Sequence, residues 1–261
     1  MSSIAQKNYS VQGIVIHRRN FLEADRILKI FTKEKGIISC TVRGARKSTS
    51  KLAGSSELFV FGTFYLAKGK KLDVLTGGKP KTFFLKNPKD LSKISDFFLI
   101  SEVIAKMMPG SVPNPKLFHE MLRAFEVLDS KKSTGAAYEF IYKTFTILGY
   151  GLILEYCAGC SRALSKQDEI YLDFTAGGVL CKECAKYKGN QISENCYKLL
   201  KYISIHDINK YSLVQLDENL LKELSKTVND YLNFIYQKEM NSAVFSRHIR
   251  ELQKKPGSGT I

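Results

Sequence analysis

Four cysteines are the residues of this sequence best suited to chemistry, and they occur as two Cys-x-x-Cys pairs. Cys157-Ala-Gly-Cys160 is followed, after twenty residues, by Cys181-Lys-Glu-Cys184. Each pair presents two thiolates from one tight turn, and two facing turns supply four sulfurs at about 2.3 Å from a metal ion. The spacing therefore predicts one structural Zn²⁺, bound by Cys157, Cys160, Cys181 and Cys184.

Two other uses of these cysteines compete with structural zinc. Disulfides would suit a secreted chain, but Met1–Ser10 has no hydrophobic signal region. A catalytic zinc would need an open coordination position, which four thiolates fill. We therefore expect a folding role, in which the metal stabilises a segment that is too small to fold alone.

The segment between the two pairs must fold back to bring them together. Glu169–Phe174 has the composition of a short strand, Thr175–Gly178 that of a turn, and Val179-Leu180 leads into the second pair. Helical spacing of apolar residues surrounds this hairpin. It predicts helices over 91–107, 117–130, 136–148, 193–203 and 219–238, with a continuation over 242–254.

Charge is the second informative feature. The chain of 261 residues carries a formal net charge of +15. Residues 1–83 hold sixteen Lys and Arg against five Asp and Glu, so +11 of this charge lies in the first third. A positive field concentrated in one region indicates a polyanionic partner, with nucleic acid ahead of an anionic membrane surface.

The same region has the pattern of a small β-barrel. Five strands are expected over 11–19, 25–32, 36–43, 58–67 and 72–76, with a basic Gly/Ser segment and one helical turn over 44–54. Five strands with a short element after the third favour an OB-type barrel, with an SH3-like barrel as the alternative. The fold class expected is thus α+β and multidomain: an N-terminal five-stranded OB-type barrel followed by an α-helical domain with an inserted four-cysteine zinc module.

Basic residues gather at the predicted strand connections. Lysine and arginine neutralise phosphates, glycine lets a backbone approach closely, and Ser48, Thr49 and Ser50 add neutral donors. We expect Phe21, Phe59, Phe61 and Tyr65 to lie mostly in the barrel core, with base stacking as the alternative role. The residues expected to bind DNA are Arg18, Arg19, Arg26, Lys33, Lys35, Arg43, Arg46, Lys47 and Lys51.

Three stretches resemble one protein family. Gly36–Leu52, with its Arg-Gly-Ala-Arg-Lys run, is similar to the N-terminal domain of the bacterial recombination mediator RecO. Phe145–Cys184, with its four cysteines and internal Gly-Gly, and Ser246–Leu252 extend the resemblance over most of the chain. Cysteines are not universal in that family, so their presence places this sequence in its zinc-bearing branch.

The resemblance implies a function that the residues alone do not reveal. It implies a DNA-binding and strand-annealing protein of repair and homologous recombination, which helps load RecA on DNA coated with single-stranded-DNA-binding protein. It implies contacts with single- and double-stranded DNA, with RecR and with the acidic, hydrophobic C-terminal tail of the coating protein. We expect cytoplasmic, nucleoid-associated localisation and no membrane span.

Four domains are expected: a basic OB-fold domain over 1–83, a helical domain over 84–154 and 190–253, a zinc module over 155–189 and a flexible tail over 254–261.

The sequence has no HExxH and no Walker-type phosphate loop, so we expect no enzyme activity. Two alternatives stay open, namely an RNA- or ribosome-associated zinc-ribbon protein and an enzyme that uses zinc. Cys40 and Cys196 are expected to be small buried residues.

Overall fold

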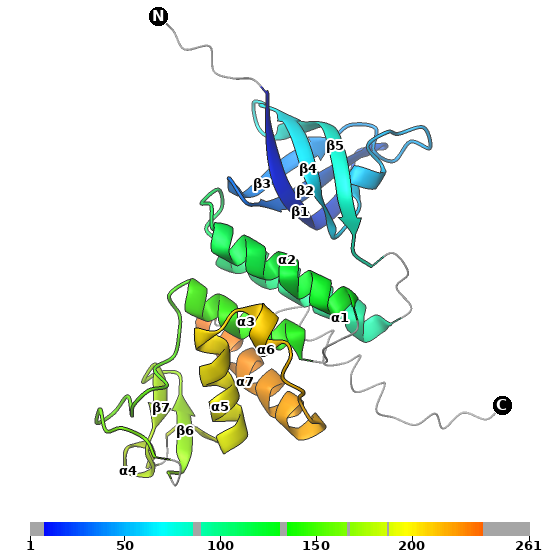
Figure 1. Ribbon diagram of the computed structural model, residues 1–261. Coiled ribbons are helices and arrows are strands. Elements are labelled where there is room, and N and C mark those ends of the chain that lie inside the picture. The colour runs from blue at the N-terminus through cyan, green and yellow to red at the C-terminus, as the bar shows by residue number, and fades with distance from the viewer. Residues whose placement is uncertain (1–7, 86–89, 131–134, 166–167, 187, 237–261) are drawn as a thin grey trace, which may run out of the picture. The chain divides into compact units, whose positions relative to one another are not determined.

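The computed structural model describes residues 8–85, 90–130, 135–165, 168–186 and 188–236 (Figure 1). The expected helical continuation over 242–254 and the expected tail over 254–261 lie outside these ranges. The chain forms two compact units, one within residues 1–129 and one within residues 130–248. Each unit is described by itself.

Five strands close into a barrel in the first unit. They are β1 (Asn8–Phe21), β2 (Asp25–Thr32), β3 (Gly36–Val42), β4 (Val60–Ala67) and β5 (Asp73–Phe83). Their order around the barrel is β1-β2-β3-β5-β4, and every neighbouring pair is antiparallel except β3 and β5. This order and the short helical turn Gly54–Ser56 after β3 are those of an OB fold. The OB-type barrel is confirmed, and the SH3-like alternative is wrong.

Strand β1 is longer than predicted because it pairs with two neighbours. Its first half, from Asn8 to Ile14, pairs with β4, and its second half, from Gly13 to Phe21, pairs with β2. Gly13 belongs to both ladders and lies opposite Gly62 on β4. A Cβ on Gly13 would lie 2.5 Å from Ile30 Cγ2, so only glycine fits where the strand passes from one partner to the other.

Alternating inward residues fill the barrel. Val15, Leu28, Ile30, Phe64 and Leu66 are all at most 1% exposed. Cys40 on β3 lies among them with no exposed surface, as predicted, and Cys196 is equally buried in the second unit.

Two helices pack against the barrel within the same unit, α1 (Leu91–Met107) and α2 (Pro115–Asp129). Asp90 caps α1 by accepting the N–H groups of Ser92 and Lys93. The Phe59 ring lies 5.1–5.8 Å from the rings of Phe97, Phe98 and Phe125. The unit therefore extends through residue 129, which differs from the expected helical domain beginning at residue 84. The four expected domain boundaries stay a prediction.

The second unit combines helices with a small sheet. Its helices are α3 (Ala136–Ile147), α4 (Lys182–Ala185), α5 (Glu194–Ile205), α6 (Ile208–Tyr211) and α7 (Glu218–Tyr236). Its strands are β6 (Ile170–Asp173), β7 (Gly178–Leu180) and β8 (Asn190–Ile192), in the order β7-β6-β8. The predicted hairpin and the long helices are confirmed, whereas β8, α4 and α6 escaped the sequence analysis. Ser193 caps α5, as its residue type indicates.

Helix α3 is buried over most of its length and carries two ionisable groups into the interior. The Lys143 ammonium group donates to the carbonyls of Ile203 and Ser204, at 3.0 and 2.8 Å. These carbonyls end α5, where a positive charge is favourable. Glu139 has no exposed surface, and neither carboxylate oxygen has a hydrogen-bond partner. Burial raises the pKa of Glu139 to about 8.

This carboxyl makes the second unit less stable in base. The folded-state pKa lies above the ordinary value of 4.5, so the folded state holds its proton through a window in which the unfolded chain releases it. Stability present in acid is therefore lost as the pH rises from about 4.5 to about 8. We predict that Glu139→Gln removes this loss and stabilises the protein above pH 8 by up to ~5 kcal/mol, at about 1.4 kcal/mol per pKa unit.

Urea unfolding at pH 5 and pH 9 measures this effect. Glu126→Gln, at an exposed position on α2, is the matched control and should leave the pH dependence of the parent unchanged. If Glu139→Gln has the same pH dependence as the parent, Glu139 is not the group responsible.

Candidate metal centre and nucleic-acid interface

The first cysteine turn is shaped by its backbone. Cys157 O accepts the N–H of Ser161 at 2.8 Å, and Ser161 has a φ of +60°, which turns the chain sharply. A Cβ on Gly159 would lie 3.0 Å from Cys184 Cβ and 3.1 Å from its sulfur. Glycine therefore lets the first turn approach the second.

The second cysteine turn follows strand β7. Cys181 stands at the N-cap of α4, and its carbonyl accepts the N–H groups of Cys184 at 3.1 Å and Ala185 at 2.9 Å. The β6–β7 hairpin delivers it, with Gly177 at a φ of +73° in the turn. The first turn is tied to this hairpin by the N–H of Ala158, which donates to Val179 O at 2.8 Å.

Four sulfurs meet between these turns. The Sγ atoms of Cys157, Cys160, Cys181 and Cys184 all lie within 4.8 Å of one another. The sulfurs of Cys160 and Cys181 are 3.9 Å apart, and the Cys181 N–H donates to Cys157 Sγ at 3.3 Å. A tetrahedron with metal–sulfur bonds of about 2.3 Å has edges of about 3.8 Å. The four thiols therefore fit a tetrahedral metal ion, consistent with zinc.

Hydrogen bonds prepare one thiol to be a thiolate. Burial by itself would raise the pKa of Cys157, but the backbone N–H groups of Cys181, Cys160 and Gly159 outweigh burial and bring the pKa to about 6. Contacts with the other three sulfurs raise the pKa of Cys184 to about 12. Thiols this close cannot all ionise by themselves, so the cluster needs a cation to hold four thiolates together.

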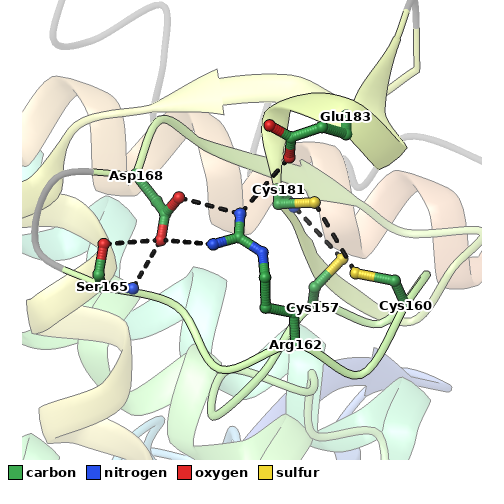
Figure 2. A network of polar contacts seen from close by, with 7 residues as sticks. All are labelled: Cys157, Cys160, Arg162, Ser165, Asp168, Cys181 and Glu183. Carbon is green, nitrogen blue, oxygen red and sulfur yellow. Dashed lines mark hydrogen bonds and ion pairs between the residues drawn. The ribbon is translucent and has the colours of Figure 1, made fainter.

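An ion-pair network borders the cluster (Figure 2). Arg162 donates to Asp168 at 3.0 Å and to Glu183 at 3.4 Å. The Ser165 N–H and then the Arg162 guanidinium lower the pKa of Asp168 to about 2, and Asp168 in turn raises that of Arg162. Arg162 follows the first cysteine turn, and its carbonyl accepts the Cys157 N–H at 2.9 Å. A guanidinium beside the cluster would offset the negative charge of four thiolates bound to one metal ion.

The apolar core around the cysteines is small. Its buried members are Cys157, Leu180, Cys181 and Ala185, so half of them are cluster cysteines. A core of this size provides little hydrophobic stabilisation, and a metal ion would replace it as the stabilising centre.

The basic residues predicted to bind DNA have different roles in the barrel. Glu57 accepts from the guanidinium groups of both Arg18 and Arg26, the latter at 2.8 Å. Arg26 also donates to Ser56 Oγ at 2.7 Å and is largely buried. These two arginines therefore hold the chain before β4 against the barrel.

The segment over 43–53, here called the basic loop, is anchored to the turn between β1 and β2. Gly44 N donates to Asp25 Oδ1 at 2.8 Å, and Arg46 donates to the Ala24 and Glu23 carbonyls through its N–H and guanidinium, at 2.9 and 2.8 Å. Its position is thus fixed while its charged side chains face solvent. The exposed predicted residues at this end of the barrel are Arg19, Arg43, Arg46, Lys47 and Lys51.

Lys33 and Lys35 lie at the opposite end of the β2–β3 hairpin. Arg26 pairs with Val42 at one end of the ladder and Thr32 with Gly36 at the other, roughly 20 Å of strand away. Lys33 and Lys35 therefore do not neighbour the basic loop. Lys35 Nζ lies 5.0 Å from the centroid of the Tyr9 ring.

The four aromatic residues considered for base stacking differ in their exposure to solvent. Phe59 is 3% exposed and packs on α1 and α2, so it belongs to the core. Phe61 is partly exposed, whereas Phe21 and Tyr65 are 38% and 37% exposed. The sequence analysis missed Lys79 and Lys81, whose amines lie over Tyr65 and Phe61. The alternation of β5, which places them on its outer face, could have indicated them.

Within the described ranges, the cysteine cluster is the one group of His, Cys, Asp and Glu able to hold a metal ion. No helix in the described part of the chain is both long enough and apolar enough to span a bilayer.

Comparisons with known proteins agree with this architecture. The class defined so far is an OB-fold protein with a basic loop and a four-thiol cluster in a separate unit. The family model "Recombination protein O N terminal" matches residues 6–84, and "Recombination protein O C terminal" matches residues 88–243. The chain belongs to the recombination protein O family.

Several curated relatives carry the name "DNA repair protein RecO". One from Dehalococcoides mccartyi is 30% identical, over 89% of this chain and 92% of its own. Relatives from Clostridium perfringens and Clostridium acetobutylicum are each 28% identical, over 92% and 93% of this chain and 97% and 98% of their own. The resemblance recognised in the sequence is therefore confirmed.

We predict that Cys160→Ser loses the bound metal and lowers the melting temperature of the second unit, because three thiolates and a hydroxyl make a poorer site. Metal content by mass spectrometry and thermal unfolding measure both effects. Cys196→Ala removes a buried cysteine outside the cluster and should keep the full metal content. A Cys160→Ser protein with unchanged metal content and melting temperature would exclude a structural metal.

Proposed function

We propose that this protein is a non-enzymatic DNA-binding and strand-annealing protein of DNA repair and homologous recombination. The observation that carries this proposal is an exposed basic loop fixed on the OB barrel of a recombination protein O family member. OB folds commonly bind single strands on such surfaces.

The residues at the β1–β2 end of the barrel form the proposed DNA contact. Arg43, Arg46, Lys47 and Lys51 extend from the basic loop, and Arg19 is exposed on the adjoining strand β1. Arg18 and Arg26 act indirectly, since their ion pairs with Glu57 hold the chain between the basic loop and β4 against the barrel. Lys33 and Lys35 would contact DNA that extends along the barrel to its other end.

Such contacts provide a physical route to annealing. Cationic side chains neutralise phosphates and reduce the repulsion between two strands. Phosphate contacts leave the base edges free, so complementary bases can pair while both strands are bound. This mode of binding accepts single- and double-stranded DNA without sequence preference.

We infer the protein partners from family membership. The protein would act on DNA coated with single-stranded-DNA-binding protein, assemble with RecR and help to load RecA. A hollow of about 380 Å³ in the second unit suits the acidic, hydrophobic tail of the coating protein. Lys201 supplies positive charge at its wall, whereas Lys198 is paired with Glu194 at 2.6 Å and Asp168 with Arg162 at 3.0 Å. Leu164, Ile170 and Ile205 supply apolar surface.

The four-thiol cluster is proposed to hold one structural Zn²⁺. Cys157, Cys160, Cys181 and Cys184 would fill the coordination shell and leave no position for a reacting water. The metal would stabilise the β6–β7 hairpin and both cysteine turns, and it would take no part in DNA chemistry.

We predict that Arg46→Ala/Lys47→Ala/Lys51→Ala weakens binding to single-stranded DNA and reduces its salt dependence. Each phosphate contact contributes about −0.7 to the slope of log affinity against log salt, so the slope should become shallower by about 2. Fluorescence anisotropy across a salt series measures it. Lys210→Ala/Lys222→Ala/Lys226→Ala removes the same charge from exposed positions of the second unit and should keep the parent slope.

Identical slopes for the two triple variants would exclude the basic loop as the DNA contact. Tighter binding of folded RNA than of DNA by the parent would favour an RNA-associated function instead.

Annealing is tested separately with complementary strands, bare and coated with single-stranded-DNA-binding protein. We predict that the parent pairs them faster than buffer alone, and that the basic-loop variant loses most of this gain because it no longer screens the phosphates. Pairing at the rate of buffer with parent protein would refute annealing, even if DNA binding is observed.

A further inference from the structure

Strands β4 and β5 present a second surface with the chemistry of a single-strand site. Outward positions of β4 carry Phe61, Thr63 and Tyr65, because alternate residues of a strand face outward. Lys79 on β5 pairs with Thr63, and its Nζ lies 5.9 Å from the Tyr65 ring centroid. Lys81 Nζ lies 5.6 Å from the Phe61 ring centroid. We call Phe61, Tyr65, Lys79 and Lys81 the lysine–aromatic track.

Gly77 has no side chain to cover the exposed ring of Tyr65. Tyr65 pairs with Gly77 across the ladder, and a Cβ at Gly77 would lie 3.3 Å from Tyr65 Cδ2. The neighbour of Tyr65 on the other side is Ser10 of β1, which is exposed and small. A flat ring flanked by small residues leaves room for a base to stack.

Negative charge is nearly absent from the two strands. β4 has no acidic residue, and β5 has one, Asp73, at its first position. Asp73 is occupied by the Tyr9 hydroxyl and by Lys68 at 3.1 Å. A polyanion bound along the track would therefore be attracted by the lysines, and no free carboxylate of β4 or β5 would repel it.

The track is separated from the basic loop along β1. Tyr65 lies beside Ser10 near the start of β1, whereas the loop is anchored at the turn that follows Phe21. Tyr65 is thus eleven residues of extended strand, roughly 36 Å of chain, from this turn, and Phe61, which pairs with Ile14, is seven residues or roughly 23 Å from it. Two DNA strands can therefore bind to one protein molecule, one on the basic loop and one on the track.

We propose that the lysine–aromatic track is a second binding surface for single-stranded DNA, so that one molecule holds two strands at once. A base stacks on Tyr65, and Lys79 swings on its flexible stem from the ring to a phosphate. Lys81, beside Phe61, meets the next phosphate along the strand, while Phe61 itself packs beside Phe118 of α2, with ring centroids 6.3 Å apart. The inference rests on the proposed annealing function and deepens it, because annealing needs both strands on one protein.

The absence of tryptophan from the chain allows a direct test. Tyr65→Trp reports the track, Phe21→Trp reports the basic-loop end, and Tyr156→Trp is an exposed control in the second unit. Each variant is titrated with a short oligothymidine, because a stacked base quenches tryptophan emission. We expect saturable quenching in Tyr65→Trp and Phe21→Trp, two oligonucleotides bound per chain, and no quenching in Tyr156→Trp.

The outcomes separate this inference from the proposed function. Quenching in Phe21→Trp but not in Tyr65→Trp, with one oligonucleotide per chain, overturns the track and leaves the basic loop as the DNA site. Binding of no oligonucleotide by any variant or by the parent overturns both. Equal quenching in all three variants indicates a non-specific effect and also overturns the track.

A pair of charge variants tests the lysines. Lys79→Ala/Lys81→Ala should weaken the second of the two binding steps and make its salt slope shallower by about 1.4, at about 0.7 per phosphate. It should also slow annealing while the first strand binds as in the parent. Lys222→Ala/Lys226→Ala, with the same loss of charge in the second unit, should match the parent. If both pairs match the parent, Lys79 and Lys81 do not contact DNA.

Discussion

The first unit depends on one strand that serves two neighbours. β1 pairs with β4 through its first half and with β2 through its second, and the two ladders overlap at Gly13 and Ile14. Without a side chain at Gly13, the strand passes between them in contact with Ile30 and without a clash. The barrel closes because of this arrangement. The two ends of β1 then determine where the basic loop and the lysine–aromatic track lie.

The second unit meets a different constraint. Its cysteine turns surround few buried apolar side chains, so the local chain has little hydrophobic stabilisation of its own. Backbone N–H groups directed at Cys157, close approach at Gly159 and the charge of Arg162 all favour a set of thiolates. The local sequence therefore suits a cation. In helix α3 of the same unit, Glu139 is buried in its protonated, uncharged form, and it lowers stability at high pH because the folded state opposes its ionisation.

Local patterns predicted those features that local interactions determine. The two cysteine turns, the β6–β7 hairpin and helix α1 over 91–107 follow from spacing, turn residues and helical periodicity. Features set by distant contacts were not predictable. The ion pairs of Arg18 and Arg26 depend on Glu57, more than thirty residues further along the chain. Phe59 is buried as expected, but it packs on α1 and α2, which the barrel pattern alone does not indicate. The placement of Lys33 and Lys35 required knowing which strand ends meet.

The exposed lysines of the barrel have a consequence for how a bound strand moves. An ammonium group on a flexible stem meets any phosphate equally well, and it makes no distinction between bases. A strand held in this way can shift by one nucleotide at almost no cost, because the next phosphate replaces the last one. Two DNA strands held in this way would slide past each other and sample successive alignments until complementary bases meet. Weak binding of the DNA backbone, equal at every phosphate, would then help two strands find their complementary alignment better than tight, specific binding.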